Sequence, residues 1–300
     1  MYHVPVLLKE CIEGLAIKPE GTYADLTFGG GGHTKAILEK LGSKGKLYAF
    51  DQDEDAKKNA EQITSSSFTL IEGNFGYLKR YLKAEGVYEV DGILADLGVS
   101  SHQIDSPERG FSTRFEGELD MRMNRQAGKT AADVIREYPE EKLHKILGMY
   151  GEIKNARTAA NVLVRERAKK PIRTITELKQ ALNSLAPRGK ENKYFAQVFQ
   201  ALRIEVNNEL EVLEQMLTQS AEVIKKGGRL VVISYHSLED RLVKNFMMKG
   251  KFYGEVEKDL YGNFEKPFEM ISRKPIEATE EEIERNSRAR SAKLRIAEKI

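Results

Sequence analysis

Tyr23-Ala-Asp-Leu-Thr-Phe-Gly-Gly-Gly-Gly-His-Thr34 is the stretch of sequence that decides the fold of this chain. Its first four residues are typical of a short buried strand, and four consecutive glycines follow soon after. The next segment, Lys35 to Leu41, carries apolar side chains at helical spacing. The stretch therefore predicts a strand from Tyr23 to Leu26, a tight glycine turn and a helix.

The glycine turn is suited to a nucleotide-like ligand. Glycine lacks a Cβ atom, so the turn can adopt positive φ and bring backbone N–H groups close to a ligand at the positive end of the helix. A second apolar strand, Lys46–Asp51, ends in an acid about twenty residues beyond the glycines, where a carboxylate can accept hydrogen bonds from both ribose hydroxyls. We therefore predict an adenosine-containing ligand, with Asp51 on its ribose. A turn needed only for helix–sheet packing is the alternative, and the pattern does not separate a nicotinamide dinucleotide from S-adenosylmethionine.

The composition of the chain narrows its class. Its 300 residues, 40% hydrophobic and 31% charged, are typical of a soluble globular protein with one large domain or with one domain carrying another. No apolar run reaches the length of a membrane span and the amino terminus lacks the order of a signal peptide, so we expect a cytoplasmic protein. Cys11 is the one cysteine, which excludes an internal disulfide and a zinc knuckle, and its helical spacing with Leu7, Leu8 and Leu15 favours a packing role.

The first hundred residues alternate strands with helices. Strands are expected at Lys46–Asp51, Phe68–Glu72 and Val90–Asp96, and this repetition predicts a parallel sheet with right-handed crossovers. The sheet pattern resumes near the carboxyl terminus. There we expect a strand over Gly227–His236, a helix over Leu238–Met248, and β-rich stretches over Phe252–Leu260 and Phe268–Pro275.

Residues 106–205 break the alternation and contain almost nothing with strand period. Thr174 and Glu177 make a capping box before an apolar helix, and a long helical pattern covers Tyr194 to Ile224. The sequence therefore predicts an α/β core formed by residues 1–105 and 206–300. An all-helical insertion, residues 106–205, splits this core after the fourth strand.

The insertion carries a concentrated positive charge, although the formal net charge of the chain is only +2. Between Lys154 and Lys190 there are ten Lys or Arg residues against two acids, Glu166 and Glu177. A solvated helix face is one interpretation. The scarcity of acids, on an insertion expected to face the ligand edge, favours a phosphate-contact surface. The carboxyl-terminal segment Arg285–Arg295 is also basic and polar.

In an open α/β sheet, ligands bind at the carboxyl ends of the strands. The residues expected there are Gly29 to His33, Asp51, Asn74, Phe75, Asp96 and Ser234 to His236. Phe75 can lie against an adenine ring or pack in the core. Asp96 ends a strongly apolar strand, where an unpaired carboxylate is costly, so we expect a specific partner such as a ligand amine; a helix cap is the alternative. His33, His102 and His236 lie in separate loops without the short spacings of zinc motifs, so we predict no metal site.

Several long blocks of the sequence are specific enough to indicate a family. They are His3-Val-Pro-Val-Leu-Leu, Asp25-Leu-Thr-Phe-Gly-Gly-Gly-Gly-His-Thr34, Asp96-Leu-Gly-Val-Ser-Ser101, Arg109-Gly-Phe111, Leu119-Asp-Met-Arg-Met123, Ile233-Ser-Tyr-His-Ser-Leu-Glu-Asp-Arg241 and Arg290-Ser-Ala-Lys-Leu-Arg295. Over essentially the whole chain they resemble the bacterial ribosomal RNA small-subunit methyltransferase H family. The resemblance implies a class I S-adenosylmethionine-dependent methyltransferase with a Rossmann-like, mostly parallel sheet. Its substrate would be the exocyclic N4 of one cytidine in the decoding region of 16S ribosomal RNA, in the small ribosomal subunit.

The resemblance also implies which residues bind the cofactor. They are Gly31, Gly32, His33, Asp51, Phe75, Asp96 and Gln103. Gln103, and the choice of Gly31 and Gly32 among the four glycines, come from the resemblance alone. The sequence does not decide between a monomer and a homodimer.

The chemistry of this reaction suggests catalytic residues. The amine lone pair is delocalised into the ring, so the enzyme must position donor and acceptor, exclude water and place an acceptor oxygen near the amine. We predict Asp96, Ser234 and His236 as catalytic residues. The chain has Asp96-Leu-Gly-Val99 where better-known amino-methyltransferases have Asp, Asn or Ser, two prolines and an aromatic. The aromatic that stacks on the base must therefore come from elsewhere, with Phe111, Phe115 and Tyr235 as candidates.

Two other functions fit parts of the pattern. A nicotinamide-dependent dehydrogenase would use the same glycine turn and acid. A ribosome-assembly factor would bind RNA through the insertion and keep the nucleotide-binding fold only as a scaffold.

Overall fold

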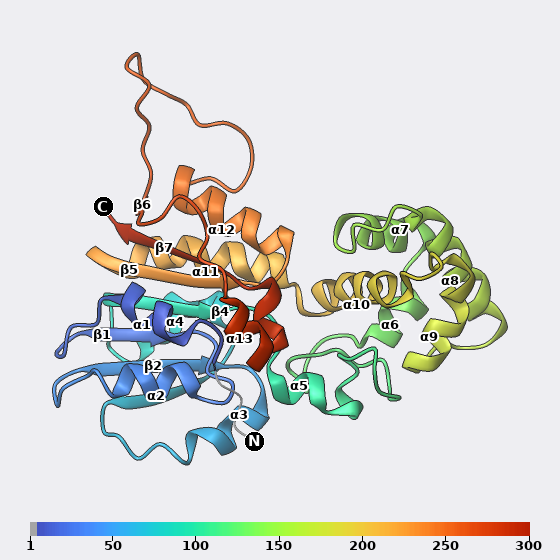
Figure 1. Cartoon of the computed structure of the whole chain (residues 1–300), viewed down its shortest axis with the longest axis horizontal. Helices are drawn as coiled ribbons and strands as arrows, with labels where there is room; N and C mark the ends of the chain where they lie inside the picture. The colour runs from blue at the N-terminus through green and yellow to red at the C-terminus, as the bar shows by residue number, and fades with distance from the viewer. Residues whose placement is uncertain (1–4) are drawn as a thin grey trace. The chain divides into compact units, whose positions relative to one another are not determined.

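The computed structural model describes residues 5–300, so the first residues of the motif that begins at His3 lie outside it. Contacts within the chain divide it into two compact units (Figure 1). The first unit, here called the sheet unit, contains the chain up to Gly98 together with Leu210–Ile300, and the second, here called the helical unit, is Val99–Glu209. Within residues 5–300, no helix is both long enough and apolar enough to cross a membrane.

The sheet unit is built on a seven-stranded sheet with the order β3-β2-β1-β4-β5-β7-β6. The strands are β1 (Thr22–Asp25), β2 (Lys46–Asp51), β3 (Phe68–Glu72), β4 (Val90–Asp96), β5 (Ile224–Ser234), β6 (Phe268–Met270) and β7 (Lys293–Lys299). Strands β1 to β5 pair in parallel, and β7 runs antiparallel to both β5 and β6. This mostly parallel sheet confirms the predicted Rossmann-like α/β fold. The strand order reverses between β1 and β4, which is where ligands bind in such sheets.

Helices cover both faces of this sheet, because its central strands bury side chains on both sides. Along β4, Ile93 and Ala95 belong to one apolar cluster and Leu94 to the other. Cys11 is fully buried in the second cluster, in agreement with the predicted packing role. The helices of this unit are α1 (Leu8–Leu15), α2 (Gly32–Leu38), α3 (Glu54–Ala60), η1 (Phe75–Tyr77), α4 (Leu78–Ala84), α11 (Glu209–Val223), α12 (Ser237–Lys249), α13 (Glu280–Arg285) and η4 (Ser287–Ser291).

The helical unit has an apolar core of its own. The capping box of Thr174 and Glu177 is present at the start of α9. Within the described part of this unit, strand pairing is limited to an isolated bridge between Glu118 and Thr174. The helices are α5 (Ser101–Asp105), η2 (Pro107–Arg109), α6 (Ala131–Glu137), α7 (Glu140–Met149), α8 (Ala156–Lys169), α9 (Ile175–Leu182), η3 (Asn183–Leu185) and α10 (Glu191–Asn207).

Two predicted elements are wrong. The single helix expected over Tyr194–Ile224 is interrupted at Asn208, which adopts a left-handed conformation with φ 50° and so ends α10 before α11 begins. No strand forms over Phe252–Leu260, where Leu260 is fully exposed and buries no apolar surface.

The carboxyl-terminal segment is also different from the basic, polar tail that was expected. Its last three residues, Lys293 to Arg295, begin β7, which lies between β5 and β6 (Figure 1). Arg295 is only 4% exposed, and its guanidinium binds the carboxylate of Asp240 on α12 at 2.7 Å. The charge of Arg295 therefore stabilises the packing of α12 against β7.

Candidate active site

The carboxyl ends of the parallel strands bring the predicted site residues to one edge of the sheet. Asp25 at the end of β1 is in register with Leu94 of β4, and Asp96 at the end of β4 is in register with Ile233 of β5. Beyond β1 the pairing continues, since the N–H of Leu26 donates to the Leu94 carbonyl and the N–H of Phe28 to the Phe50 carbonyl. The glycine turn therefore starts from a fixed position between β2 and β4.

The glycine turn is closely packed against the protein at Gly32 and faces open space at Gly30. Gly31 precedes α2 with φ 74°, in the left-handed region that favours glycine. A Cβ atom on Gly32 would lie 2.2 Å from Cγ of Pro5, so this position also requires glycine. A Cβ atom on Gly30 would meet no atom within 4 Å. The turn thus leaves free space beside Gly30, where a ligand can approach the backbone.

Asp51 fastens the glycine turn to the end of β2. One carboxylate oxygen accepts a hydrogen bond from the N–H of Gly29 at 2.8 Å, and the other from the N–H of Asp53 at 2.8 Å. Burial raises the pKa of Asp51 to about 6, although both N–H donors act to lower it. Each oxygen retains a second acceptor position, so the carboxylate can still receive hydroxyl groups.

Asp96 is held by groups from three other segments. Its Oδ1 atom accepts a hydrogen bond of 2.6 Å from the hydroxyl of Tyr235, and its backbone N–H donates to Oγ1 of Thr27 at 2.7 Å. The Oδ2 atom lies 3.9 Å from Nδ1 of His33. The side chain of Asp96 is still 23% exposed, so a substrate can reach it. Tyr235, expected from the sequence at this edge and as a candidate stacking residue, is thus the direct hydrogen-bond partner of the predicted catalytic acid.

His33 faces this carboxylate with a defined nitrogen. Its Nε2 atom lies 3.1 Å from the carbonyl oxygen of Val6, which can only accept, so Nε2 carries a hydrogen. The Nδ1 atom therefore faces Asp96. Burial raises the pKa of Asp96, while His33 and the hydroxyl of Tyr235 act in the opposite direction. Whether His33 also contacts a cofactor, as the resemblance implies, stays a prediction.

Asp25 is a buried acid at this edge that was not among the site residues predicted from the sequence. It accepts hydrogen bonds from Oγ1 of Thr34 at 2.7 Å and from the N–H of Thr27 at 3.1 Å. Burial raises the pKa of Asp25, against the effect of His33 and of these donors. Because Thr27 also receives the N–H of Asp96, it connects the two acids. The sequence contained the information needed to place Asp25 at this edge, because Asp25 ends β1 in the same way that Asp96 ends β4.

Ser234 and His236 make structural contacts at the end of β5. The hydroxyl of Ser234, which is 2% exposed, donates to the carbonyl of Lys293 on β7 at 3.4 Å. His236 precedes α12 and caps it, because its Nδ1 atom accepts from the N–H of Glu239. Its Nε2 atom lies 3.2 Å from a carboxylate oxygen of Glu239. The catalytic roles predicted for Ser234 and His236 stay predictions. In the structure, Ser234 connects β5 to β7 and His236 caps α12.

Phe75 lies in η1, directly after β3, and packs partly buried against the apolar cluster beneath α4 and α11. The preceding residue, Asn74, donates from Nδ2 to Oε1 of Gln52, the residue that follows β2. Gln103 belongs to the helical unit, where it forms a capping box with Ser100 and is 5% exposed. The cofactor contacts implied for Phe75 and Gln103 stay predictions.

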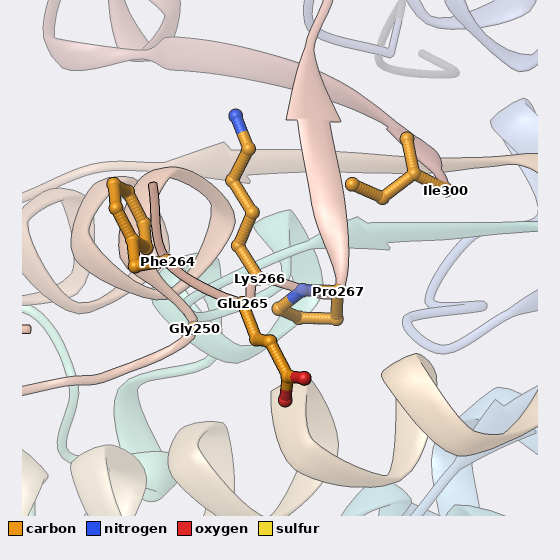
Figure 2. A pocket seen from close by; sticks show the side chains of 6 residues that line it. All are labelled: Gly250, Phe264, Glu265, Lys266, Pro267 and Ile300. Atoms are coloured by element: carbon orange, nitrogen blue, oxygen red, sulfur yellow. The ribbon is translucent and has the colours of Figure 1, made fainter. Parts of the chain in front are cut away.

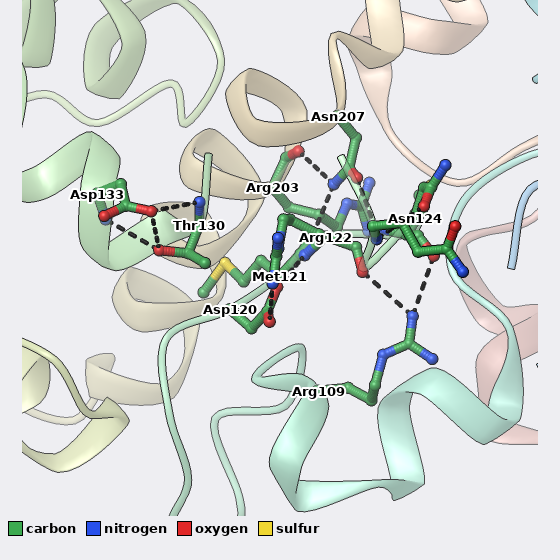
Figure 3. Close-up of polar contacts among 11 residues, drawn as sticks. Arg109, Asp120, Met121, Arg122, Asn124, Thr130, Asp133, Arg203 and Asn207 are labelled. Carbon is green, nitrogen blue, oxygen red and sulfur yellow. Dashed lines mark hydrogen bonds and ion pairs between the residues drawn. The ribbon is translucent and has the colours of Figure 1, made fainter. Parts of the chain in front are cut away.

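In the helical unit, the two sequence blocks that begin at Arg109 and Leu119 form one hydrogen-bonded network (Figure 3). The guanidinium of Arg109, a residue only 1% exposed, donates to the carbonyls of Arg122 and Met123 at 3.1 Å each. Met121 adopts φ 60°, and this unfavourable conformation is fixed from both sides. Its N–H donates to the Arg109 carbonyl and its own carbonyl accepts from Nδ2 of Asn207. The network holds the loop between η2 and α6 in one conformation.

A hollow of about 610 Å³ lies at the opposite edge of the sheet (Figure 2). It is lined by Gly250, Phe264, Glu265, Lys266, Pro267 and Ile300. Strand β7 runs antiparallel to β5, from Lys293 opposite Ser234 to Glu298 opposite Arg229, so Ile300 lies toward the amino ends of the parallel strands. The hollow therefore contains none of the predicted site residues, and it lies far from the chemistry expected at the carboxyl ends.

Comparison with known proteins places these features in a family. The model of the MraW methylase family matches residues 1–300. A protein of Cytophaga hutchinsonii is 63% identical over 299 residues, which is 100% of both chains, and one of Flavobacterium johnsoniae is 56% identical over 100% of this chain and 98% of its own length. A protein of Phocaeicola vulgatus is 55% identical over 100% of this chain and 98% of its own length, and all three are called "Ribosomal RNA small subunit methyltransferase H". A solved structure of a putative rRNA-methylase from Clostridium thermocellum aligns over 100% of both chains with 14% identity and a TM-score of 0.47.

Proposed function

Because this chain belongs to the MraW methylase family, whose members use S-adenosylmethionine, we propose that it methylates the exocyclic N4 of one cytidine in the decoding region of 16S ribosomal RNA. The ribosomal RNA of the small subunit as substrate is supported by the names of relatives that are 54–63% identical over nearly all of the chain. The methylated atom and its position in the RNA are what the resemblance of the sequence blocks to the methyltransferase H family implies. We place this reaction in the cytoplasm, on the RNA of the small subunit.

The sheet edge offers what an adenosyl cofactor needs. Space beside Gly30 lets a ligand approach the backbone, and Asp51 presents fixed carboxylate oxygens to ribose hydroxyls. Both features lie on the same edge as Asp96. When bound, the cofactor supplies an electrophilic methyl group. We assign cofactor binding to Gly31, Gly32, His33, Asp51 and Phe75, together with Asp96 and Gln103.

The single observation that carries the proposal is the fixed carboxylate of Asp96. The hydroxyl of Tyr235 occupies one position on Oδ1, and the remaining acceptor positions of the carboxylate are available to an amine hydrogen. Accepting that hydrogen raises the electron density on the nitrogen and removes its proton as the new bond forms. The partial burial of Asp96 strengthens this interaction, because charge is screened less away from water.

Asp51 gives cofactor binding a dependence on pH. Its pKa of about 6 means that the carboxylate is charged above pH 6 and becomes protonated below it. Protonation turns an acceptor for the ribose into a donor, so affinity should fall as the pH falls through 6. We expect the Kd of S-adenosylhomocysteine to rise about 10-fold between pH 7 and pH 5, as measured by isothermal titration calorimetry. The Asp51→Asn variant should bind more weakly with a flat pH profile; an equally steep profile in this variant would assign the effect to another group.

One experiment tests the proposed reaction directly. Small subunits from a strain that lacks the enzyme are incubated with the protein and labelled S-adenosylmethionine, and the nucleosides are then analysed. We expect the label in N4-methylated cytidine from the decoding region. Label at another atom or another nucleotide would refute the proposed specificity, and binding of NAD without S-adenosylhomocysteine would favour the dehydrogenase.

The assembly-factor alternative makes a different prediction for Asp96→Ala. The proposed enzyme should lose methyl transfer in this variant and keep RNA binding. A scaffold protein would show no methyl transfer even with the unchanged chain.

A further inference from the structure

The basic run of the helical unit separates into two groups in the structure. Five of its members are ion-paired or hydrogen-bonded to nearby side chains and backbone carbonyls, and so contribute to the fold. Lys169 and Arg165 share the carboxylate of Glu166 at 2.9 and 3.2 Å, and Lys170 binds Glu177 at 2.8 Å. Lys179 donates to the carbonyl of Thr113. A fifth, Arg167, donates to the carbonyls of Ile135 and Tyr138.

The second group consists of exposed basic side chains that form none of these contacts. Lys154, Arg157, Arg188 and Lys190 are exposed, and so is Lys193 in the first turn of α10. Throughout residues 5–300, the structure shows no hydrogen bond or ion pair made by any of these five side chains. They are called here the free basic group. Arg173, the one remaining member of the run, lies beside Glu177, which accepts from its backbone N–H at 2.8 Å.

The free basic group comes from three segments that are tied together. Nδ2 of Asn155, at the start of α8, donates to the carbonyl of Leu185 at 3.2 Å, just ahead of the loop with Arg188. Nε2 of Gln197, in the second turn of α10, donates to the carbonyl of Glu152 at 3.3 Å. The residues that precede α8, those that precede α10 and the first turns of both helices therefore meet at one end of the helical unit.

The balance of charge at this end is strongly positive. Two acids are present among these segments, Glu152 and Glu191, and the carboxylate of Glu191 already accepts from the N–H of Gly189 at 2.9 Å. An exposed cation without a partner can bind a phosphate without first breaking an ion pair. A paired cation such as Lys170 must give up its carboxylate, which removes most of the gain.

We propose that the free basic group is the surface through which the helical unit binds the phosphodiester backbone of the RNA substrate, and that the paired half of the run takes no part. This inference rests on the proposed function, because it assumes an RNA substrate. It narrows the phosphate-contact surface expected over Lys154–Lys190 to one end of the helical unit. An acidic protein partner would be the competing occupant of such a surface.

The test compares two variants with the same loss of charge. Arg157→Gln, Arg188→Gln and Lys190→Gln are combined in one protein, and Arg165→Gln, Lys169→Gln and Lys170→Gln in the matched control. Binding of a small-subunit RNA fragment with an unpaired target region is measured by fluorescence anisotropy over a range of potassium chloride concentrations. Each phosphate contact to single-stranded RNA contributes about 0.7 to the slope of log K against log[salt].

For the first variant we expect the magnitude of this slope to fall by about 2, and the affinity at 0.1 M salt to fall about 100-fold. The control should change the slope by less than about 0.5. Equal changes in the two proteins would overturn the proposal in favour of a general charge effect. Unchanged binding of naked RNA, with weaker binding to the assembled subunit, would overturn it in favour of an acidic protein partner.

Two further measurements keep the outcome interpretable. The variant Lys154→Gln with Lys193→Gln tests the same surface if the triple variant does not fold, and its slope should fall by about 1.4. Affinity for S-adenosylhomocysteine should be unchanged in all variants. If the unchanged protein does not methylate RNA, the proposed function is refuted. If it does, and the salt slope falls equally in the first variant and the control, only the inference about the free basic group is refuted.

Discussion

Asp96→Asn is expected to lower kcat for RNA methylation by about 100- to 10,000-fold, the usual range for losing a group that accepts a proton in the transition state. Asparagine has nearly the same shape and its amide oxygen can still accept from the Tyr235 hydroxyl, so the variant removes the charged acceptor with little change in shape. RNA binding should be unchanged. Single-turnover methylation with excess enzyme, measured beside RNA affinity, separates the chemical step from substrate binding.

Two other variants make this result specific to the site. Asp91→Asn is the matched control, because Asp91 lies on the same strand but binds Lys225 and the N–H of Thr22 at the opposite end of the sheet. We expect its kcat to be unchanged. Tyr235→Phe keeps the charge of Asp96 but removes the 2.6 Å hydrogen bond, so kcat should fall less, by about 10-fold. A kcat for Asp96→Asn within about threefold of the unchanged protein would refute a role for this carboxylate in proton transfer.

Arg109→Met is expected to destabilise the helical unit by about 3 to 5 kcal/mol. The substitution keeps most of the buried volume but leaves the carbonyls of Arg122 and Met123 without the guanidinium. The two residues that follow the strained backbone of Met121 then lose the side chain that holds them in place. Hydrogen exchange measures this effect locally, at the amides of Leu119, Met121 and Ala131, each of which donates to a backbone carbonyl.

Protection of these three amides should fall by a factor of about 100 to 1,000 or more. Arg114→Met is the control, since Arg114 lies in the same loop with an exposed side chain and should leave protection unchanged. Arg109→Lys should lie between the two, because lysine keeps the charge but not the fork of donors that reaches two carbonyls. Unchanged protection in Arg109→Met would show that the loop is held by its other contacts alone.

The strands of the sheet unit could be predicted because buried parallel strands are short apolar runs that end in glycine or an acid. Lys46–Asp51, Phe68–Glu72 and Val90–Asp96 have the bounds expected from such runs. Strand β7 could not be predicted in this way. Its apolar residues, Leu294 and Ile296, alternate with arginine and lysine, and only pairing with β5 and β6 shows that Arg295 is buried.

The candidate site shows the same division between local and long-range information. Asp51 and Asp96 could be proposed because each ends a strand, and parallel strands end on one edge. The partners of Asp96 could not be identified, because Thr27 and Tyr235 are distant in sequence and only the fold shows which way their side chains point. Ser234 was chosen for its position, but its hydroxyl turns toward β7, a strand that the sequence did not reveal.

The insertion of the helical unit between two adjacent strands has a consequence for how the protein is made. Strand β4 pairs with β5, yet about 130 residues separate them, so a ribosome adding about 5 to 20 residues per second delivers β5 roughly 6 to 25 s after β4. During that interval the nascent sheet has an open apolar edge, while the helical unit, complete in sequence, can already collapse around its own core. Chaperone dependence in this protein should therefore concentrate on the exposed edge of β4 and end when β5 emerges.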